Sequence, residues 1–319
     1  PLAVYATILK GAFRSKMAIQ ATVKYTVPLC ICALGVTLAF KMRFWNIGGE
    51  GQLIMGGVFA SFFALFCTGW NHWALLAAMF AAGAVGGGLW GLLPAVFKSR
   101  WNTNETLFTL MLNYIAILLT EYFTVLVIGA SSSTASNALQ TPPVYETAKL
   151  PVLIKGTYAN AGIFVAVAVV IVVAFIYRYT IKGYELRQVG ENLRFSKVGG
   201  VNVVRTFLSI FLISGFVAGL CGGVEVLGSH GRFVSRFSNN LGWDGIMISM
   251  IAKNSPFGVL FVSILWGVLK AGALHMERVT NTNRLTVVLI QALFVLFVTI
   301  DYKKIYAFFR GRFGRRAVQ

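Results

Sequence analysis

The chain has 319 residues, of which 57% are hydrophobic and 12% are charged, and its mean hydropathy is +0.74. Soluble domains are about 45–50% apolar and about 25% charged, so this composition excludes a soluble enzyme, a disordered chain and a disulfide scaffold. The formal net charge of +18 would also suit a nucleic-acid-binding protein, but the basic residues lie in short segments between apolar runs. The composition therefore predicts one polytopic membrane domain, residues 1–319. The positions of its basic residues indicate which loops lie on the cytoplasmic side.

Apolar runs along the chain predict the membrane helices, because a spanning helix requires about 20 mostly apolar residues. A further run, Trp243–Ala252, is apolar but too short to span, and we expect a broken or re-entrant helix there. The expected fold class is therefore all-α, with about eight spanning helices and one short segment. The predicted spans are Ala21–Phe40, Gln52–Gly69, Trp73–Phe97, Glu105–Ile128, Ala159–Tyr177, Thr206–Gly228, Phe257–His275 and Leu285–Ile300.

Lysine and arginine set the expected orientation, because cytoplasmic loops are enriched in both. The tail at residues 301–319 and the loop at residues 178–205 are strongly basic, so both are expected to be cytoplasmic. The loop at residues 129–158 is sparsely basic and is expected to be extracytoplasmic. This alternation requires the short segment to complete one crossing. It also places the first residues outside, so we expect one more helix before Pro1 and an interfacial segment at Leu2–Phe13.

Cysteine and histidine give no indication of a metal site. The four cysteines lie in apolar runs, where they are expected to be small buried side chains. The spacing of Cys30 and Cys32 is not that of a zinc site, and the chain has three histidines in all. We therefore expect no bound metal, no cofactor and no metal-dependent catalysis.

Glycines repeat at every fourth position in two of the predicted spans. The first set is Gly83, Gly87 and Gly91, and the second is Gly215, Gly219 and Gly223. Small residues at this spacing let membrane helices approach closely. The repeats therefore predict a tightly packed bundle and carry no information about a substrate.

A glycine-rich break separates the first two predicted spans and contains Asn46, Glu50 and Gln52. Glycine allows the backbone to leave helical geometry, and an ionisable group near membrane depth is a functional-site hypothesis by default. We therefore place these three residues on the expected substrate path. The alternative is that Glu50 lies on a cytoplasmic turn and pairs with Lys41 or Arg43.

The fourth span carries Thr109, Asn113 and Glu121 on one helical face. Such a stripe faces a pore or a neighbouring helix rather than lipid, and interhelical hydrogen bonding is the simpler explanation. Asn113 is included in the expected substrate path. Glu225 and Lys270 lie near the outer ends of their spans, where they would be able to pair, and Glu225 is also assigned to the path.

Asp244 opens the short segment, directly after Trp243. A polar group at the mouth of a broken helix is a plausible ligand contact, so Asp244 completes the expected path. A helix N-cap is the alternative interpretation.

The loop at residues 178–205 is the most specific feature of the chain. Gly190 is expected to break it, Glu191 or Asn192 to cap a following short helix, and Gly199 with Gly200 to end that helix. Leu193 and Phe195 are apolar on an otherwise charged element, which indicates a docking surface. The alternative is a surface loop packed beneath the bundle.

The segment Phe44–Gly57 (FWNIGGEGQLIMGG) resembles permeases of bacterial ABC importers, above all the nucleoside and simple-sugar branch, which is related to ribose and branched-chain amino-acid permeases. Four further stretches agree in order along the chain. They are Asn104–Ala116, Gly183–Gly199, Ser214–Gly228 and Gly242–Ile246.

The resemblance implies a division of labour in which this chain forms half of a translocation pathway for a nucleoside or related solute and works by alternating access. A second, similar permease would complete a heterodimeric pore in the bacterial inner membrane, and an extracytoplasmic binding protein would deliver the solute. Two ATP-binding subunits would supply ATP hydrolysis, since this chain has no P-loop sequence and is not itself expected to be an enzyme. Membrane lipid is the remaining expected partner, and nucleic acid is not expected. The resemblance assigns these subunits to a coupling loop formed by Glu185, Leu186, Arg187, Gly190, Glu191, Asn192, Phe195, Ser196 and Gly199.

Two other classes of function remain open from the sequence. An ion-coupled secondary transporter is suggested by Glu121, Glu225 and Lys270, because charged residues in membrane segments often mark ion paths. An integral-membrane enzyme would need a cluster of reactive groups at one membrane face, and no such cluster is visible in the sequence.

Overall fold

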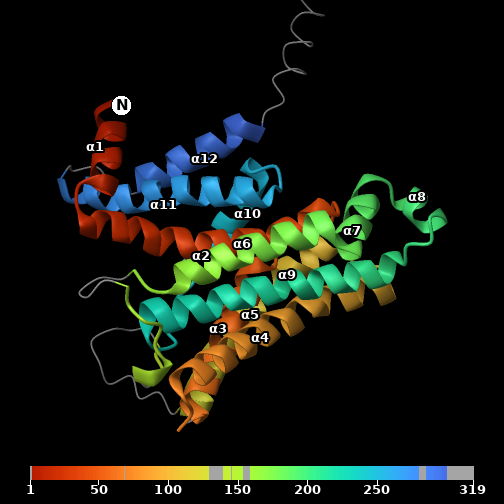
Figure 1. Cartoon of the computed structure of the whole chain (residues 1–319), viewed down its shortest axis with the longest axis horizontal. Coiled ribbons are helices and arrows are strands. Elements are labelled where there is room, and N and C mark those ends of the chain that lie inside the picture. Colours follow the sequence, from red (N-terminus) through yellow and green to blue (C-terminus); the bar gives the residue numbers. More distant parts are fainter. Residues whose placement is uncertain are drawn as a thin grey trace, which may run out of the picture.

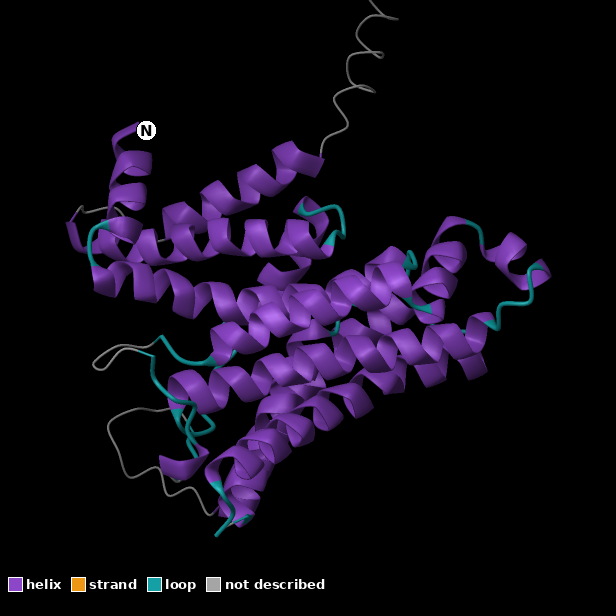
Figure 2. Cartoon of the chain, viewed as in Figure 1, coloured by secondary structure: helices purple, strands orange, loops and turns teal. Residues whose placement is uncertain are grey.

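The computed structural model describes residues 2–67, 69–128, 139–144, 146–153, 159–279 and 285–299, which form helices without a named strand (Figures 1 and 2). The predicted all-α fold is confirmed. The first half contains α1 (Leu2–Phe13), α2 (Lys16–Lys41), α3 (Gly49–Phe66), α4 (His72–Trp101), α5 (Glu105–Ile128) and η1 (Glu146–Ala148). The second half contains α6 (Gly162–Tyr179), α7 (Ile181–Glu191), α8 (Leu193–Val198), α9 (Val203–Glu225), η2 (Val226–His230), α10 (Leu241–Ile251), α11 (Pro256–Val279) and α12 (Leu285–Thr299).

Seven helices in the described part of the chain are long and apolar enough to cross a membrane, namely α2, α3, α4, α5, α6, α9 with η2, and α11. They match seven of the predicted spans, although α2 begins at Lys16 rather than at Ala21. The eighth predicted span is α12, which the structure describes over Leu285–Thr299. The predicted tail at residues 301–319 and much of the 129–158 loop lie outside the described residues. The chain is a multi-pass membrane protein.

Helix α2 runs through the middle of the bundle, and α11 and α12 lie on one side of it while α9, α3 and α4 lie on the other (Figure 1). It packs against α9, α10 and α11, and an unbroken run of residues from Val27 to Phe40 is buried. The pair α7 and α8 projects from one end of the bundle. The described part of residues 139–153 lies at the opposite end (Figure 1).

Helix α1 has one face packed against α11. Ile8 and Ala12 are buried, and a Cβ at Gly272 would come within 2.3 Å of the Ile8 carbonyl oxygen. Leu9 and Phe13 remain exposed on the other face. The segment expected to be interfacial is therefore part of the packed bundle.

The glycine repeats bring α3, α4 and α9 into backbone contact. A Cβ at Gly87 would lie 2.5 Å from the Gly215 carbonyl oxygen, and a Cβ at Gly219 would lie 2.3 Å from the Gly83 carbonyl oxygen. Likewise a Cβ at Gly222 would lie 2.0 Å from the Leu53 carbonyl oxygen. Since no real Cβ approaches backbone atoms so closely, the interface requires glycine at these positions. The prediction of a close-packed bundle is confirmed.

This packing gives a matched pair of substitutions on one helix. We expect Gly219→Ala to lower the stability of the purified chain by about 1–3 kcal/mol, because the added methyl group would force two backbones apart. A Cβ at Gly223 would meet the Ala60 Cβ at 3.5 Å, an ordinary contact, so Gly223→Ala is expected to be nearly neutral. Apparent melting temperatures in detergent measure both effects, and equal loss in the two variants would contradict this account.

The connection from α9 to α10 leads the chain back into the bundle. The chain leaves η2 through Gly231, pairs Val234 with Gln140 in an isolated β-bridge, and re-enters the bundle to begin α10 at Leu241. Asn239 and Asn240 both adopt positive φ, which turns the backbone sharply before the helix. The short apolar segment is therefore a half-length helix that starts within the bundle, as predicted.

Candidate substrate path and coupling surface

Glu50 joins the start of α3 to the start of α10. Its side chain is 5% exposed, and its carboxylate accepts a 2.6 Å hydrogen bond from the Gly242 backbone N–H and a second one from the Ser238 hydroxyl. The carboxylate therefore satisfies an otherwise free N–H in the first turn of a buried helix. Pairing with Lys41 or Arg43 is wrong, because both Glu50 oxygens are engaged by the α10 entrance.

Asn46 and Gln52 form a buried polar network with α9. The Gln52 amide donates to the Asn46 side-chain oxygen at 3.2 Å, and Asn46 donates to the Ser214 hydroxyl at 3.1 Å. Ser214 in turn donates to the Gly35 carbonyl in α2 at 2.7 Å. These bonds hold three helices at the glycine-rich break, so the sequence-predicted pair is used here for packing between helices.

Asn113 fixes the same break from α5. Its side-chain oxygen accepts from the Gly51 N–H at 2.8 Å, and its amide donates to the Ile47 carbonyl at 2.9 Å. Thr109, one turn earlier, accepts from the Ile47 N–H at 3.2 Å. Thr109 and Asn113 therefore face the start of α3, in agreement with interhelical hydrogen bonding. A role for Asn113 in solute contact remains a prediction.

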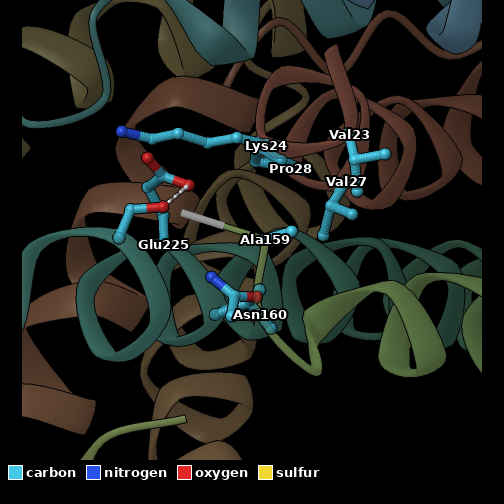
Figure 3. A pocket seen from close by; sticks show the side chains of 9 residues that line it. Val23, Lys24, Val27, Pro28, Ala159, Asn160 and Glu225 are labelled. Atoms are coloured by element: carbon cyan, nitrogen blue, oxygen red, sulfur yellow. Dashed lines mark hydrogen bonds between the residues drawn. The ribbon is translucent and has the colours of Figure 1, made fainter. Parts of the chain in front are cut away.

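Two further acidic residues lie at the end of the bundle opposite α7 and α8. Glu121 binds Arg236 at 3.1 Å and Ser235 at 2.8 Å. Glu225 accepts from Ser229 at 3.2 Å and lies 3.5 Å from the His230 imidazole nitrogen. Figure 3 shows Glu225 beside a small cavity, of about 10 Å³, that Lys24 and Asn160 also border. Such a space holds about one water molecule, which is too small for a solute.

Lys270 pairs with Asp244 and not with Glu225, a pairing that the sequence had left open. The second Asp244 oxygen accepts from the Trp266 indole N–H at 3.4 Å. No side-chain capping bond is present at the described start of α10, so the N-cap interpretation of Asp244 is also wrong. Asp244 and Lys270 line a cavity between α10, α11 and α12.

The predicted path residues therefore separate into three places. Asn46, Gln52 and Asn113 hold the glycine-rich break, Glu50 and Asp244 lie at the two sides of the α10 entrance, and Glu225 lies at the far end of α9. Sequence reasoning missed Ser214 and Ser238, because an isolated serine in an apolar run has no pattern that distinguishes it. The structure brings them to Asn46 and Glu50 across separations of more than 160 residues.

One face of α7 is built into the bundle. Leu186 is fully buried, and a Cβ at Gly190 would lie 2.2 Å from the Lys41 carbonyl oxygen. Arg187 donates to the Tyr177 carbonyl and lies over the Tyr177 ring, 5.2 Å from its centroid. Gly190 therefore allows close approach to the end of α2 and does not break the helix, which continues to Glu191. The predicted break at Gly190 is wrong.

Glu185 ties α7 to the start of α9. It accepts from Lys182 at 2.9 Å and from the Thr206 hydroxyl at 3.0 Å. The hydrogen bond from Lys182 is the main cause of a lowered pKa of the Glu185 carboxyl. Partial burial acts to raise this pKa, and the hydrogen bond from Thr206 adds to the lowering. A lowered pKa means that this contribution to stability is present at neutral pH and is lost as the pH falls through the acidic range.

Helix α8 is capped at both ends and exposes apolar side chains. Asn192 caps it by accepting from the N–H groups of Arg194 and Phe195, and Gly199 ends it before Gly200 at φ +81°, as predicted. Ser196 is buried and donates to the Asn192 carbonyl at 2.8 Å. Phe195 is 62% exposed and Val198 is 88% exposed. The loop is therefore both anchored to the bundle and exposed at its tip.

Comparison with known proteins identifies the family to which the chain is similar. Residues 18–298 match the family described as "Branched-chain amino acid transport system / permease component". The chain is 33% identical over 304 residues to the guanosine ABC transporter permease protein NupP of Bacillus subtilis, covering 93% of this chain and 85% of NupP. It is 30% identical over 317 residues to the glucose ABC transporter permease protein TsgB13 of Haloferax volcanii, covering 96% and 82%.

Among solved structures, a chain of PsaBC from Streptococcus pneumoniae in complex with Fab superposes with a TM-score of 0.55 at 13% identity. The match covers 93% of this chain and 96% of that chain, and at this identity it shows a shared fold. The family match spans nearly the whole described bundle, including the α10 entrance and the α7–α8 loop. The chain therefore belongs to the branched-chain amino acid transport system permease family and is the membrane-spanning permease of an ABC transporter.

Proposed function

We propose that the chain imports a nucleoside, as half of a pathway completed by a second, similar permease in the bacterial inner membrane. The observation that carries this proposal is the 33% identity to a permease named for guanosine, over 93% of the chain. The resemblance of Phe44–Gly57 to the nucleoside branch agrees with it. A sugar is the competing solute, because TsgB13 is named for glucose.

Two ATP-binding subunits dock on the α7–α8 loop in this proposal, and an extracytoplasmic binding protein delivers the solute at the opposite end. The exposed Phe195 and Val198 side chains suit an apolar socket in such a subunit, whereas the buried Leu186 and Gly190 would transmit its movement to α2. ATP would be bound by these subunits and not by this chain. Rocking of the helices around the α10 entrance would then alternate access between the two membrane faces.

The charges that suggested an ion-coupled carrier have partners in the structure. Glu121 pairs with Arg236, and Lys270 pairs with Asp244. Both pairs are explained by contacts between segments, so neither favours ion coupling over ATP-driven import.

Uptake in the native host tests the solute. A strain from which this gene is deleted should lose uptake of radiolabelled guanosine and regain it when the intact chain is restored, with glucose uptake unchanged throughout. Loss and recovery of glucose uptake, with guanosine uptake unaffected, would contradict the nucleoside assignment.

A further inference from the structure

One face of α6 carries an exposed apolar stripe that leads to the junction with α7. Three exposed side chains recur at every fourth residue, so they lie on the same side of the helix. They are Val167, Ile171 and Phe175. Because α6 is long and apolar enough to cross a membrane, this stripe is suited to contact lipid acyl chains.

The stripe ends in a tyrosine and an arginine. Tyr179 is the next residue at the same spacing, is 69% exposed, and has its ring centroid 5.6 Å from that of Phe175. Arg178 is exposed beside it, with its guanidinium 5.7 Å from the centroid of the Tyr179 ring. Tyrosine at the end of a spanning helix is typical of the membrane–water interface, where arginine side chains extend toward the headgroups. Arg178 and Tyr179 therefore lie at the depth of phospholipid headgroups.

The start of α7 continues this surface. Gly183 packs against the end of α6, because an added Cβ would lie 2.1 Å from the Ile176 carbonyl oxygen. The Thr180 hydroxyl donates to the same carbonyl at 2.6 Å and accepts from the Gly183 N–H at 3.1 Å. Ile181 is 78% exposed, and Tyr184 is exposed one turn later. The corner between α6 and α7 is therefore held in place and presents apolar side chains next to the end of a membrane span.

The same corner carries an excess of positive charge. The ends of α2 and α7 meet α6 at Tyr177, where the Lys41 ammonium and the Arg187 guanidinium each lie 5.2 Å from the ring centroid. Among the described residues, no carboxylate lies within ion-pair distance of Lys41, Arg178 or Arg187. These cations therefore attract an anion from outside the chain.

A ligand for this corner has to bring a negative charge next to an apolar chain. Glu185 does not supply the charge, because it is paired with Lys182. An inorganic anion would leave the α6 stripe uncovered, and a zwitterionic lipid would bring a cation of its own. An anionic phospholipid has both parts, and the cytoplasmic leaflet is the one that carries such lipids. The basic residues of the 178–205 loop predict that the corner lies on that side.

We propose that the corner between α6 and α7 binds one anionic phospholipid of the cytoplasmic leaflet. Its phosphate lies against Arg178, and an acyl chain lies along Ile171 and Phe175. Since α7 packs against the end of α2 through Gly190, the bound lipid stabilises the base of the loop on which the ATP-binding subunits are proposed to dock. The site goes beyond the proposed function and does not depend on which solute is carried.

Lipid titration of the purified full chain, in an uncharged detergent, tests this site. A short-chain phosphatidylglycerol should raise the apparent melting temperature along a saturable curve, and the matching phosphatidylcholine should raise it far less. Arg178→Gln should shift the midpoint of the phosphatidylglycerol curve to about fivefold higher concentration, because one basic residue near an anionic surface contributes about that factor. Arg178→Lys keeps the charge and should retain nearly the affinity of the intact chain.

The matched control is Arg194→Gln, which removes the same charge from the same loop. Arg194 is exposed on α8, which projects away from the bundle, so its loss should leave the curve unchanged (Figure 1). Phe175→Ser tests the acyl-chain contact and should weaken phosphatidylglycerol binding. Glycerol 3-phosphate, which carries a phosphate without acyl chains, should give no shift with the intact chain.

Equal midpoints for Arg178→Gln and the intact chain would overturn the site, as would equal shifts by the two lipids or no shift by either. Equal weakening by Arg178→Gln and Arg194→Gln would replace the site with a general attraction to the basic loop. A shift by glycerol 3-phosphate as large as that by phosphatidylglycerol would indicate an anion site without a lipid chain. Unchanged phosphatidylglycerol affinity in Arg178→Gln, with loss of co-purifying ATP-binding subunits, would assign Arg178 to the subunit contact and refute the lipid site.

Discussion

Replacing Glu191 with alanine and Phe195 with serine together should uncouple transport from ATP while leaving the chain folded and inserted. Both side chains are exposed on the α7–α8 loop, so their loss removes no bond within the described bundle on which folding depends. Removing an aromatic anchor from an interface costs about 2 kcal/mol or more, which corresponds to about a thirtyfold or greater loss in docking affinity. ATP-dependent guanosine uptake should fall accordingly.

The matched control for this double variant is Phe164→Ser. Phe164 is 66% exposed, close to the 62% of Phe195, but it lies near the start of α6, far along the chain from the α7–α8 loop. Its replacement should leave uptake unchanged at equal expression. Normal transport by the double variant would show that α8 is not the docking surface.

Glu50→Ala should cause the largest loss of stability and of uptake among single substitutions at the glycine-rich break. It leaves the Gly242 N–H and the Ser238 hydroxyl buried without their acceptor. Each such group costs about 1–3 kcal/mol, so a total loss of about 3 kcal/mol is expected. The α10 entrance should also lose its fixed connection to α3, which we expect to slow uptake.

Two further variants sharpen this prediction. Glu50→Gln keeps an oxygen for the Gly242 N–H and should retain more stability than Glu50→Ala. Glu121→Ala removes an acid whose Arg236 partner is 73% exposed, and an exposed pair contributes about 1 kcal/mol or less. Apparent melting temperatures in detergent should therefore rank Glu121→Ala above Glu50→Gln and Glu50→Ala last. Equal melting temperatures for the three would contradict the structural role of Glu50.

Hydrophobic runs and glycine spacing predicted most of the fold from the sequence, because both patterns are local. The seven spans, the half-length α10 and the close packing of the glycine-bearing helices follow from them, whereas the contact of α4 with α9 in particular comes from the structure. The partners of charged side chains were not predictable in the same way, because they lie far apart in the sequence. The sequence offered Glu225 as a possible partner of Lys270, whereas the structure pairs Lys270 with Asp244.

The candidate site was predicted in part. Glu50 stood out because an acid in a glycine-rich break is rare, but its partners Ser238 and Gly242 lie about 190 residues away. The break predicted at Gly190 was wrong because glycine is also used where two backbones approach closely, and not only where a helix ends. Gly190 lies against the Lys41 carbonyl, which leaves no room for a side chain.

The central claim is that this permease works as one part of an ATP-driven importer. The most direct test is to purify the tagged chain in mild detergent from its native host and to identify the proteins that accompany it by mass spectrometry. The account predicts an ATP-binding subunit and a second, similar permease in stable association. Purification of the chain alone, with solute transport retained in liposomes without ATP, would contradict it and establish a secondary carrier.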